Sequence, residues 1–309
     1  MPAFTRRFRL IASLAAVALA VALGGETSEA QRTDTAATKA WLLAADRALA
    51  GAVETRGAAA LIEALTAQSA VLIPGQPILS GRDAEQPFLQ RYGGASKHRW
   101  RALAAVASTD NAFGCTVGLT TFTSGTDSLH RERAGQYVMC WRRSPRGEPQ
   151  LIGLQRNDAP PGVPLPSTSF DGGAMPHSGT MRSGSSALGA AQDADAAFAA
   201  EGGTIAGPLA AFVKYVAADG LFPGETVGAR GPAMVREAFA GWPAGRLLLW
   251  APTRSMGYAA GGLAFTVGEA TNRKADSDEG LTRSKYLTVW RLEADGSWKW
   301  IFDLGSPRP

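Results

Sequence analysis

The stretch KYLTVWRLEADGSWKWIFDLGSPRP, residues 285–309, carries the clearest strand pairing in the chain. Its two runs, residues 286–293 and 298–304, alternate aromatic or β-branched residues with other types. Between them stands Ala-Asp-Gly-Ser, and an Asp-Gly pair is typical of the two-residue loop of a β-hairpin. The stretch therefore predicts two antiparallel strands.

The hairpin also predicts which side chains share a face. With Asp295-Gly296 as the loop, Trp290 lies opposite Ile301 and Thr288 lies opposite Asp303, and opposed residues point to the same side of a sheet. The predicted face with the acid contains Tyr286, Thr288, Trp290, Ile301 and Asp303. The other face contains Leu287, Val289, Arg291, Trp298, Trp300 and Phe302.

The N-terminus has the features of an export signal. Three arginines (Arg6, Arg7 and Arg9) precede an apolar run at residues 10–23, and Ser-Glu-Ala ends at Ala30 with small residues where a signal peptidase cleaves. The run is shorter than the roughly 20 residues of a membrane-spanning helix, so a retained anchor is the weaker alternative. We expect residues 1–30 to be a signal peptide cleaved after Ala30, and the mature protein to be periplasmic or secreted, with no membrane partner.

The size and the charge of the chain limit its domain number and its partners. A chain of 309 residues with 45% hydrophobic and 19% charged residues can bury a large core and favours two domains. Cleavage after residue 30 removes three arginines and two glutamates, which lowers the formal charge from +4 to +3. Because the basic residues are dispersed, we expect no nucleic-acid partner.

Internal matches predict a tandem duplication. Asp46 matches Asp195, and residues 137–141 (YVMCW) match residues 286–290 (YLTVW), both at an offset of 149. The same offset relates residues 71–75 (VLIPG) to 220–224 (GLFPG), whereas Gly118-Leu119 and Phe122-Thr123 match Gly261-Gly262 and Phe265-Thr266 at an offset of 143.

The copies predict two α+β domains, at residues 38–157 and 188–309, joined by a linker rich in Pro, Gly and Ser at residues 158–187. Each copy begins with helical periodicity and ends with strand alternation, an order typical of α+β folds. We expect each sheet to be antiparallel.

Residues of the second copy resemble a known family. They are WAPTRSMGYAAG at 250–261, Tyr286-x-Thr-x-Trp290-Arg, DGSWK at 295–299 and FDLG at 302–305. This pattern resembles the SnoaL-like, ketosteroid-isomerase-like branch of the nuclear transport factor 2-like superfamily, and within it a group without a defined function. The resemblance covers the second copy and, more loosely, the first. It implies cones, each with helices packed into a curved antiparallel sheet around a pocket for a small, largely apolar molecule.

The two copies differ at the acid of the hairpin. Leu154 stands in the first copy where Asp303 stands in the second, which predicts a degenerate pocket in the first domain. Asp303 is the candidate catalytic residue, because a carboxylate among aromatic side chains has a raised pKa and can act as a general base. The alternative is a hydrogen-bonded carboxylate that stabilises the strand end.

Other residues are weaker candidates. Asp195, like Asp46, is either an acid that reaches the pocket from the first helix or an exposed helical residue. Trp250, Tyr258, Tyr286 and Trp290 either bind the ligand or belong to the core.

The cysteines and histidines bear on cross-links and metals. Cys115 and Cys140 face each other if a hairpin turn is centred near residues 127 and 128, so a disulfide is a plausible hypothesis in an exported chain. His98 and His130 lack partners at ligand spacing, so we expect no metal and no cofactor.

Three functions remain open at this point. The first is binding of a small apolar molecule in the second domain without catalysis, and the second is an isomerase- or dehydratase-like enzyme that uses Asp303. The third is a structural module whose domains pack sheet against sheet as an intrachain pseudo-dimer, with Trp298, Trp300 and Phe302 as an apolar outer face. The chain is expected to be such a monomer or a homodimer.

Overall fold

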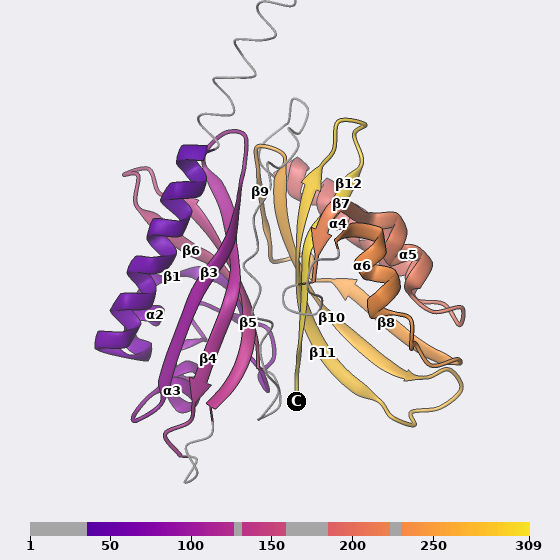
Figure 1. The fold of residues 1–309 in the computed structure, drawn as a ribbon, viewed down its shortest axis with the longest axis horizontal. Coiled ribbons are helices and arrows are strands. Elements are labelled where there is room, and N and C mark those ends of the chain that lie inside the picture. Colours follow the sequence, from indigo (N-terminus) through magenta and orange to yellow (C-terminus); the bar gives the residue numbers. More distant parts are fainter. Residues whose placement is uncertain (1–35, 127–131, 159–184, 223–229) are drawn as a thin grey trace, which may run out of the picture.

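The computed structural model describes residues 36–126, 132–158, 185–222 and 230–309 (Figure 1). The predicted signal peptide lies outside the described residues, and so does nearly all of the predicted linker. Within the described ranges, no helix combines the length and the apolar character that crossing a membrane requires.

In its described residues, the first domain contains a sheet and three helices. Its strands, in the order β2-β1-β6-β5-β4-β3 across the sheet, are β1 (Leu65–Leu72), β2 (Leu79–Ser80), β3 (Lys97–Ala107), β4 (Phe113–Thr123), β5 (Glu132–Arg143) and β6 (Pro149–Asp158). Its helices are residues 36–56, α2 (Ala58–Ala64) and α3 (Glu85–Tyr92).

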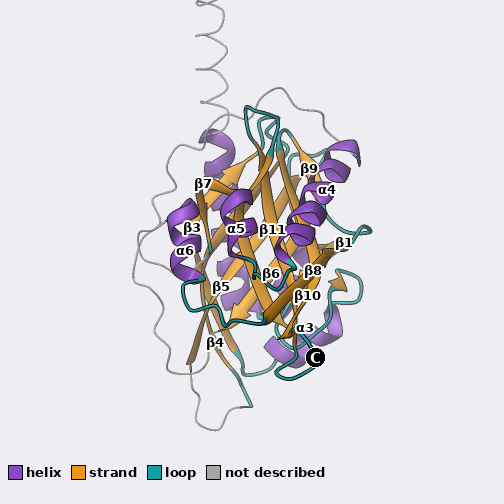
Figure 2. Ribbon diagram, turned by 90° about the vertical axis from the view of Figure 1, so that its right-hand side faces the viewer, coloured by secondary structure: helices purple, strands orange, loops and turns teal. Residues whose placement is uncertain are grey.

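The second domain repeats this plan. Its strands, in the order β7-β12-β11-β10-β8 with β9 beside β10, are β7 (Val216–Leu221), β8 (Arg246–Pro252), β9 (Tyr258–Ala260), β10 (Leu263–Lys274), β11 (Thr282–Leu292) and β12 (Trp298–Pro307). Its helices, α4 (Ser185–Gly202), α5 (Leu209–Tyr215) and α6 (Gly231–Ala238), lie across one face of the sheet (Figure 2).

The α+β class and the cones with helices against a curved sheet are confirmed, but the sheets are mixed. β1 pairs with β6 in parallel, and β7 pairs with β12 in parallel. The sequences of β1 (LTAQSAVL) and β7 (VAADGL) follow a helix directly and lack a clear alternation, so they gave no strand signal.

The pairing registers correct part of the internal alignment. Tyr137 pairs with Gly118 on β4, and its counterpart Tyr286 pairs with Gly268 on β10. Residues of β4 therefore correspond to residues of β10 at an offset of 150, and the predicted match at an offset of 143 is wrong. Ala70 of β1 pairs with Gly153, and Leu221 of β7 pairs with Phe302, which is the counterpart of Gly153. Residues of β1 therefore correspond to residues of β7 at an offset of 151, two residues more than the predicted offset of 149. The glycine that pairs with each tyrosine thus identifies which residues of the two domains correspond.

A β-bulge changes the predicted faces. Between Val289 and Trp290 the pairing shifts, so that Trp290 lies opposite Trp300 instead of Ile301. Trp300 therefore points to the helices, where its ring stacks on Phe222 at a centroid distance of 5.1 Å. The predicted outer face of Trp298, Trp300 and Phe302 is wrong for both tryptophans, because a bulge inserts one residue and reverses the alternation beyond it.

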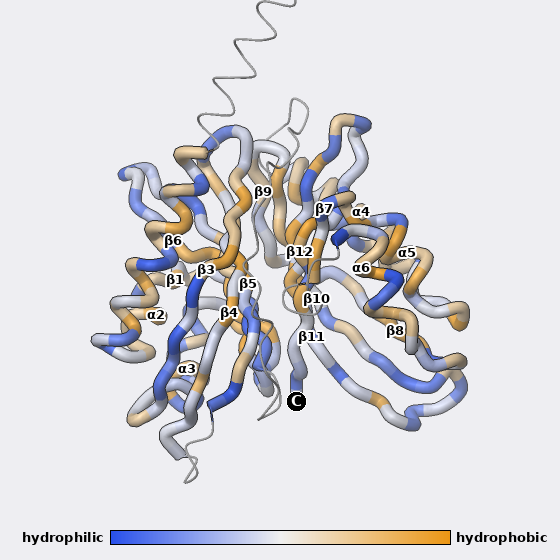
Figure 3. The backbone as a smooth tube through the Cα atoms, in the orientation of Figure 1, coloured by the Kyte–Doolittle hydropathy of each residue, from blue (hydrophilic) through white to orange (hydrophobic). Residues whose placement is uncertain are grey.

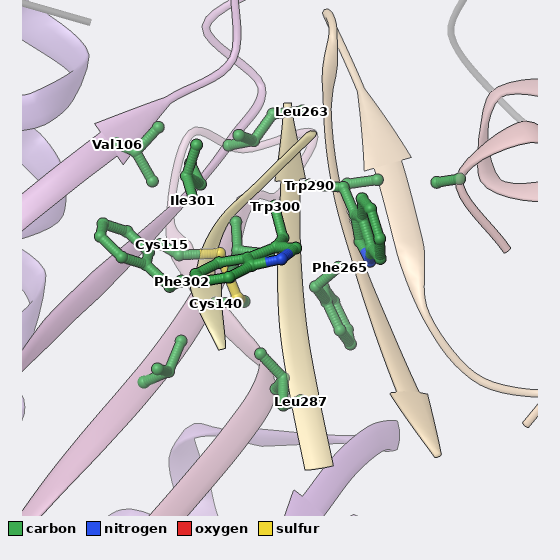
Figure 4. Packing of buried hydrophobic residues seen from close by; sticks show 14 of the residues in the cluster. Val106, Cys115, Cys140, Leu263, Phe265, Leu287, Trp290, Trp300, Ile301 and Phe302 are labelled. Carbon is green, nitrogen blue, oxygen red and sulfur yellow. A yellow bond between two sulfur atoms is a disulfide. The ribbon is translucent and has the colours of Figure 1, made fainter. Parts of the chain in front are cut away.

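The two sheets pack against each other through the faces that are turned away from the helices (Figures 1 and 3). One hydrophobic cluster joins both domains (Figure 4), and it includes Val106, Cys115, Cys140, Phe265, Leu287, Ile301 and Phe302. A disulfide links Cys115 to Cys140, which pair directly across β4 and β5. The rings of Phe113 and Phe265 are 6.2 Å apart across the contact between the domains. The two domains therefore contact each other through the faces of their sheets that are turned away from the helices.

Candidate functional site

A buried hydrogen-bond network anchors the helix of each domain to its sheet. In the second domain, Asp195 on α4 accepts hydrogen bonds from Thr266 Oγ1 at 2.7 Å and from Tyr286 OH at 3.1 and 3.2 Å. Trp290 Nε1 donates to Thr266 Oγ1 at 2.9 Å. Asp195 is fully buried, so its interpretation as an exposed helical residue is wrong.

The first domain has the same network with one more donor. Asp46 accepts from Thr116 Oγ1 at 2.6 Å and from Tyr137 OH at 3.0 and 3.1 Å. Trp100 Nε1 also donates to Asp46, at 3.0 Å. Trp250, the counterpart of Trp100, makes no such bond in the described part of the chain and instead packs on Phe198 at a centroid distance of 4.7 Å.

Glycines opposite the tyrosines make the networks possible. A Cβ on Gly268 would lie 2.4 Å from the Tyr286 ring and hydroxyl, and a Cβ on Gly118 would lie 2.8 Å from the Tyr137 ring. Any side chain at either position would push the tyrosine away from its aspartate.

Burial dominates the electrostatics of the second network. It raises the pKa of Asp195 to about 7, against the lowering effect of the hydrogen bonds from Thr266 and Tyr286, while the nearby Asp303 raises it further. Burial and the neighbouring Asp195 carboxyl raise the pKa of Tyr286. Asp195 is therefore poised to titrate near neutral pH.

Beside this network, the second cone holds a cavity of about 150 Å³. Its walls combine aromatic and aliphatic side chains with a polar end on the sheet. The lining residues are Phe198, Phe212, Leu248, Trp250, Ala270, Ser284, Tyr286, Thr288, Asp303 and Gly305.

The corresponding space in the first cone is almost closed, with about 10 Å³ left. Leu154 and Arg156 line it and take the places of Asp303 and Gly305. The Arg156 side chain is 3% exposed, and its guanidinium carbon lies 4.9 Å from the centroid of the Tyr92 ring. The predicted degenerate pocket of the first domain is thus a filled one.

The structure brings only some of the predicted residues to the cavity. Asp303, Trp250 and Tyr286 line it, and Asp303 accepts a hydrogen bond from Thr288 Oγ1 at 2.7 Å. Trp290 lies behind the cavity wall in the core, as Asp195 does. Tyr258 is elsewhere, against Phe113 at the contact between the domains, so its assignment to this pocket is wrong.

Sequence reasoning missed Phe198, Phe212, Ser284 and Gly305 as lining residues. The phenylalanines had only the helical periodicity of core positions. Gly305 could have been found, because the offset of 149 places it opposite Arg156 in the aligned copies. Among the described residues, no group of three or more His, Cys, Asp or Glu side chains is placed to hold a metal ion.

Comparison with known proteins yields partial likenesses. No family model matches the chain, and no curated protein matches it. A ketosteroid isomerase-like protein from Erwinia carotovora atroseptica is 19% identical over 39% of this chain and 95% of its own, with a TM-score of 0.33. The Δ5-3-ketosteroid isomerase from Mycobacterium sp. is 14% identical over 37% and 90%, with a TM-score of 0.30.

A longer alignment covers both domains. An Ntf2-like protein involved in plasmid conjugation spans 72% of this chain and 82% of its own, at 6% identity and a TM-score of 0.25. These identities and TM-scores are low, so the fold of this chain is assigned from its own strand order and helix positions.

Proposed function

We propose that the second domain binds a small, largely apolar molecule in its cone. The main observation in support of this proposal is a difference between the domains. The same fold leaves a cavity of about 150 Å³ in the second cone and a cavity of about 10 Å³ in the first. An apolar cavity of about this size in another protein is known to bind benzene. Aromatic walls with a few polar groups at one end are typical of small-molecule sites.

Native mass spectrometry of the mature protein, purified from its own secretory compartment, tests this proposal. We expect a bound small molecule, and we expect Gly305→Arg to release it by filling the cavity as Arg156 fills the first cone. Gly51→Ala, in the first helix of the first domain with open space around it, is the control. Retention of the molecule by the Gly305→Arg variant would contradict binding in this cone.

Proton transfer is the second candidate function. Asp303 lines the cavity as the candidate base, and Tyr286, which also lines it, connects the cavity to Asp195, whose pKa of about 7 suits an acid or base at neutral pH. We expect the protein to exchange the deuterium next to the carbonyl of labelled cyclohexanone, and Asp303→Asn to abolish this exchange. Exchange at the same rate in the variant would exclude Asp303 as the base.

Export is a separate proposal, supported by the arginines and the apolar run of the N-terminus. Intact mass measurement of the protein from its native source should give a chain that begins at Gln31. A mass that includes residues 1–30 would contradict cleavage.

A further inference from the structure

One tryptophan of each sheet takes a different position in the two cones. Trp100 of β3 and Trp250 of β8 are counterparts, because their pairing partners on β4 and β10 are related by the offset of 150. The indole of Trp100 is buried and donates to Asp46. The indole of Trp250 makes no hydrogen bond in the described part of the chain and lies against Phe198 at the cavity wall.

A glycine on α4 makes the position of Trp250 possible. A Cβ on Gly202 would collide with Cη2 of the Trp250 ring and would lie 3.0 Å from Cζ3. Asp46 and Asp195 relate the first helices of the two domains at an offset of 149, which places Val53 at the position of Gly202. Val53 is buried, so an indole could not lie in this place in the first cone.

The indole in this position is one of three aromatic walls of the cavity. The Phe198 ring meets the Trp250 ring at an interplanar angle of 67° and a centroid distance of 4.7 Å. The Phe212 ring lies 5.6 Å from Trp250 and 4.6 Å from Phe198, so the three rings are in mutual contact. An aromatic ligand can extend such a group by offset stacking or edge-to-face contact. The volume of about 150 Å³ matches a cavity that holds one benzene ring.

A side chain at Gly202 would drive the indole into this cavity. Gly202 is the last residue of α4 and is helical, and the atoms that a new Cβ meets first belong to the outer edge of the Trp250 ring. The helix can therefore stay in place while the ring moves. The backbone of Trp250 is held by its pairing with β10, and the cavity is the open volume beside the ring.

We propose that the second cone accepts a ligand with a single aromatic ring, and that Gly202 sets this size limit by holding the Trp250 indole at the wall. Gly202 does not line the cavity, so it is a positioning residue that acts through Trp250. This inference rests on the proposed binding function, and it names the class of the ligand and the residue that selects it.

Two fluorinated probes test the size limit by ¹⁹F NMR titration of the protein. Fluorobenzene has one ring, and 1-fluoronaphthalene has the same fluorine on two fused rings. We expect the wild type to bind fluorobenzene at least about tenfold more tightly, because a second ring overpacks the cavity. We expect Gly202→Val to weaken fluorobenzene binding at least about tenfold for the same reason, and Gly202→Ala to weaken it less. Gly189→Ala, on the same helix with open space around its Cβ, is the control and should leave both affinities unchanged.

Trp250→Leu removes the ring that Gly202 positions. We expect this variant to bind 1-fluoronaphthalene at least about tenfold more tightly than the wild type does, because the second ring takes the place of the indole. In the Trp250→Leu background, Gly202→Val should no longer weaken fluorobenzene binding, since no indole remains to be displaced. This double-mutant cycle separates positioning from general damage to the helix, which would weaken binding in both backgrounds.

The outcomes separate this inference from the proposed function. Equal affinity of the wild type for both probes, or an equal effect of Gly202→Val with and without the indole, would overturn the inference and leave the binding site standing. Should Gly202→Val fail to fold, unchanged fluorobenzene affinity in Gly202→Ala would overturn it. If neither probe binds to the wild type while native mass spectrometry shows a bound molecule, only the inference is overturned. If native mass spectrometry also shows no bound molecule, both proposals are overturned.

Discussion

Gly305 occupies the position in the second sheet that Arg156 occupies in the first, and this exchange separates an open cone from a filled one. Arg156 is also bound to Asp158 through its Nε at 2.9 Å. The filled cone is therefore part of the stability of the first domain, and the open cone is the one available to a ligand.

Arg156→Ala should lower the free energy of unfolding by about 3 kcal/mol, because it leaves the buried Asp158 carboxylate with one cation fewer and creates a void. Urea denaturation followed by tryptophan fluorescence measures the change. Arg146→Ala, in an exposed turn, is the matched control. A loss below about 0.5 kcal/mol would show that Arg156 does not stabilise the first cone.

Asp195 should make the protein less stable as pH rises from about 4 to 7, in opposition to buried His98, whose lowered pKa makes the protein more stable as pH rises in the same window. The folded-state pKa of Asp195 is about 7, above the ordinary value of 3.8, so the folded protein binds more protons in this window. The contribution of Asp195 is fully present below about pH 4 and is lost as pH rises through 7, by at most about 1.4 kcal/mol per pH unit. Asp46, whose pKa burial also raises, adds to the slope.

Chemical denaturation at several pH values checks this slope. Asp195→Asn should remove the larger part of it. Asp193→Asn, an exposed change on the same helix, should leave it intact, since Asp193 is bonded only to the exposed Arg254 in the described structure. An unchanged slope in Asp195→Asn would contradict the raised pKa.

Gly268→Ala should destabilise the second domain by about 2 kcal/mol or more, because the new methyl group collides with the Tyr286 ring and with the Ala251 carbonyl oxygen. Gly305→Ala lies in the same sheet on β12, which β11 separates from β10, has no such collision and serves as the control. Thermal unfolding of the two variants compares them. Equal melting temperatures would mean that the tyrosine does not require the glycine.

The disulfide between Cys115 and Cys140 closes a loop of 25 residues and should contribute about 3 kcal/mol. Titration of the denatured, unreduced protein should find no free thiol, and reduction should release two. Two free thiols before reduction would exclude the bridge.

The mature protein should be a monomer, because the convex faces of its two sheets already cover each other. Light scattering after size exclusion measures the mass directly. A stable homodimer would show that another surface associates.

The sequence predicted the hairpin of β11 and β12 and the acid of the second cone, and it offered the pairing of Cys115 with Cys140 as a hypothesis. Short-range alternation and turn chemistry set these features. The face of Trp300 could not be predicted, because the β-bulge beside Trp290 has no distinct residue signature. The parallel strands β1 and β7 depend on pairing with residues far along the chain, which local patterns do not encode.

A crystal of the mature protein soaked in bromobenzene tests the central claim most directly. Anomalous diffraction at the bromine edge should place one peak in the second cone, among Phe198, Phe212 and Trp250, and none in the first cone beside Arg156. Absence of a peak in the second cone, or a peak of equal height in the first, would contradict the assignment of the binding site.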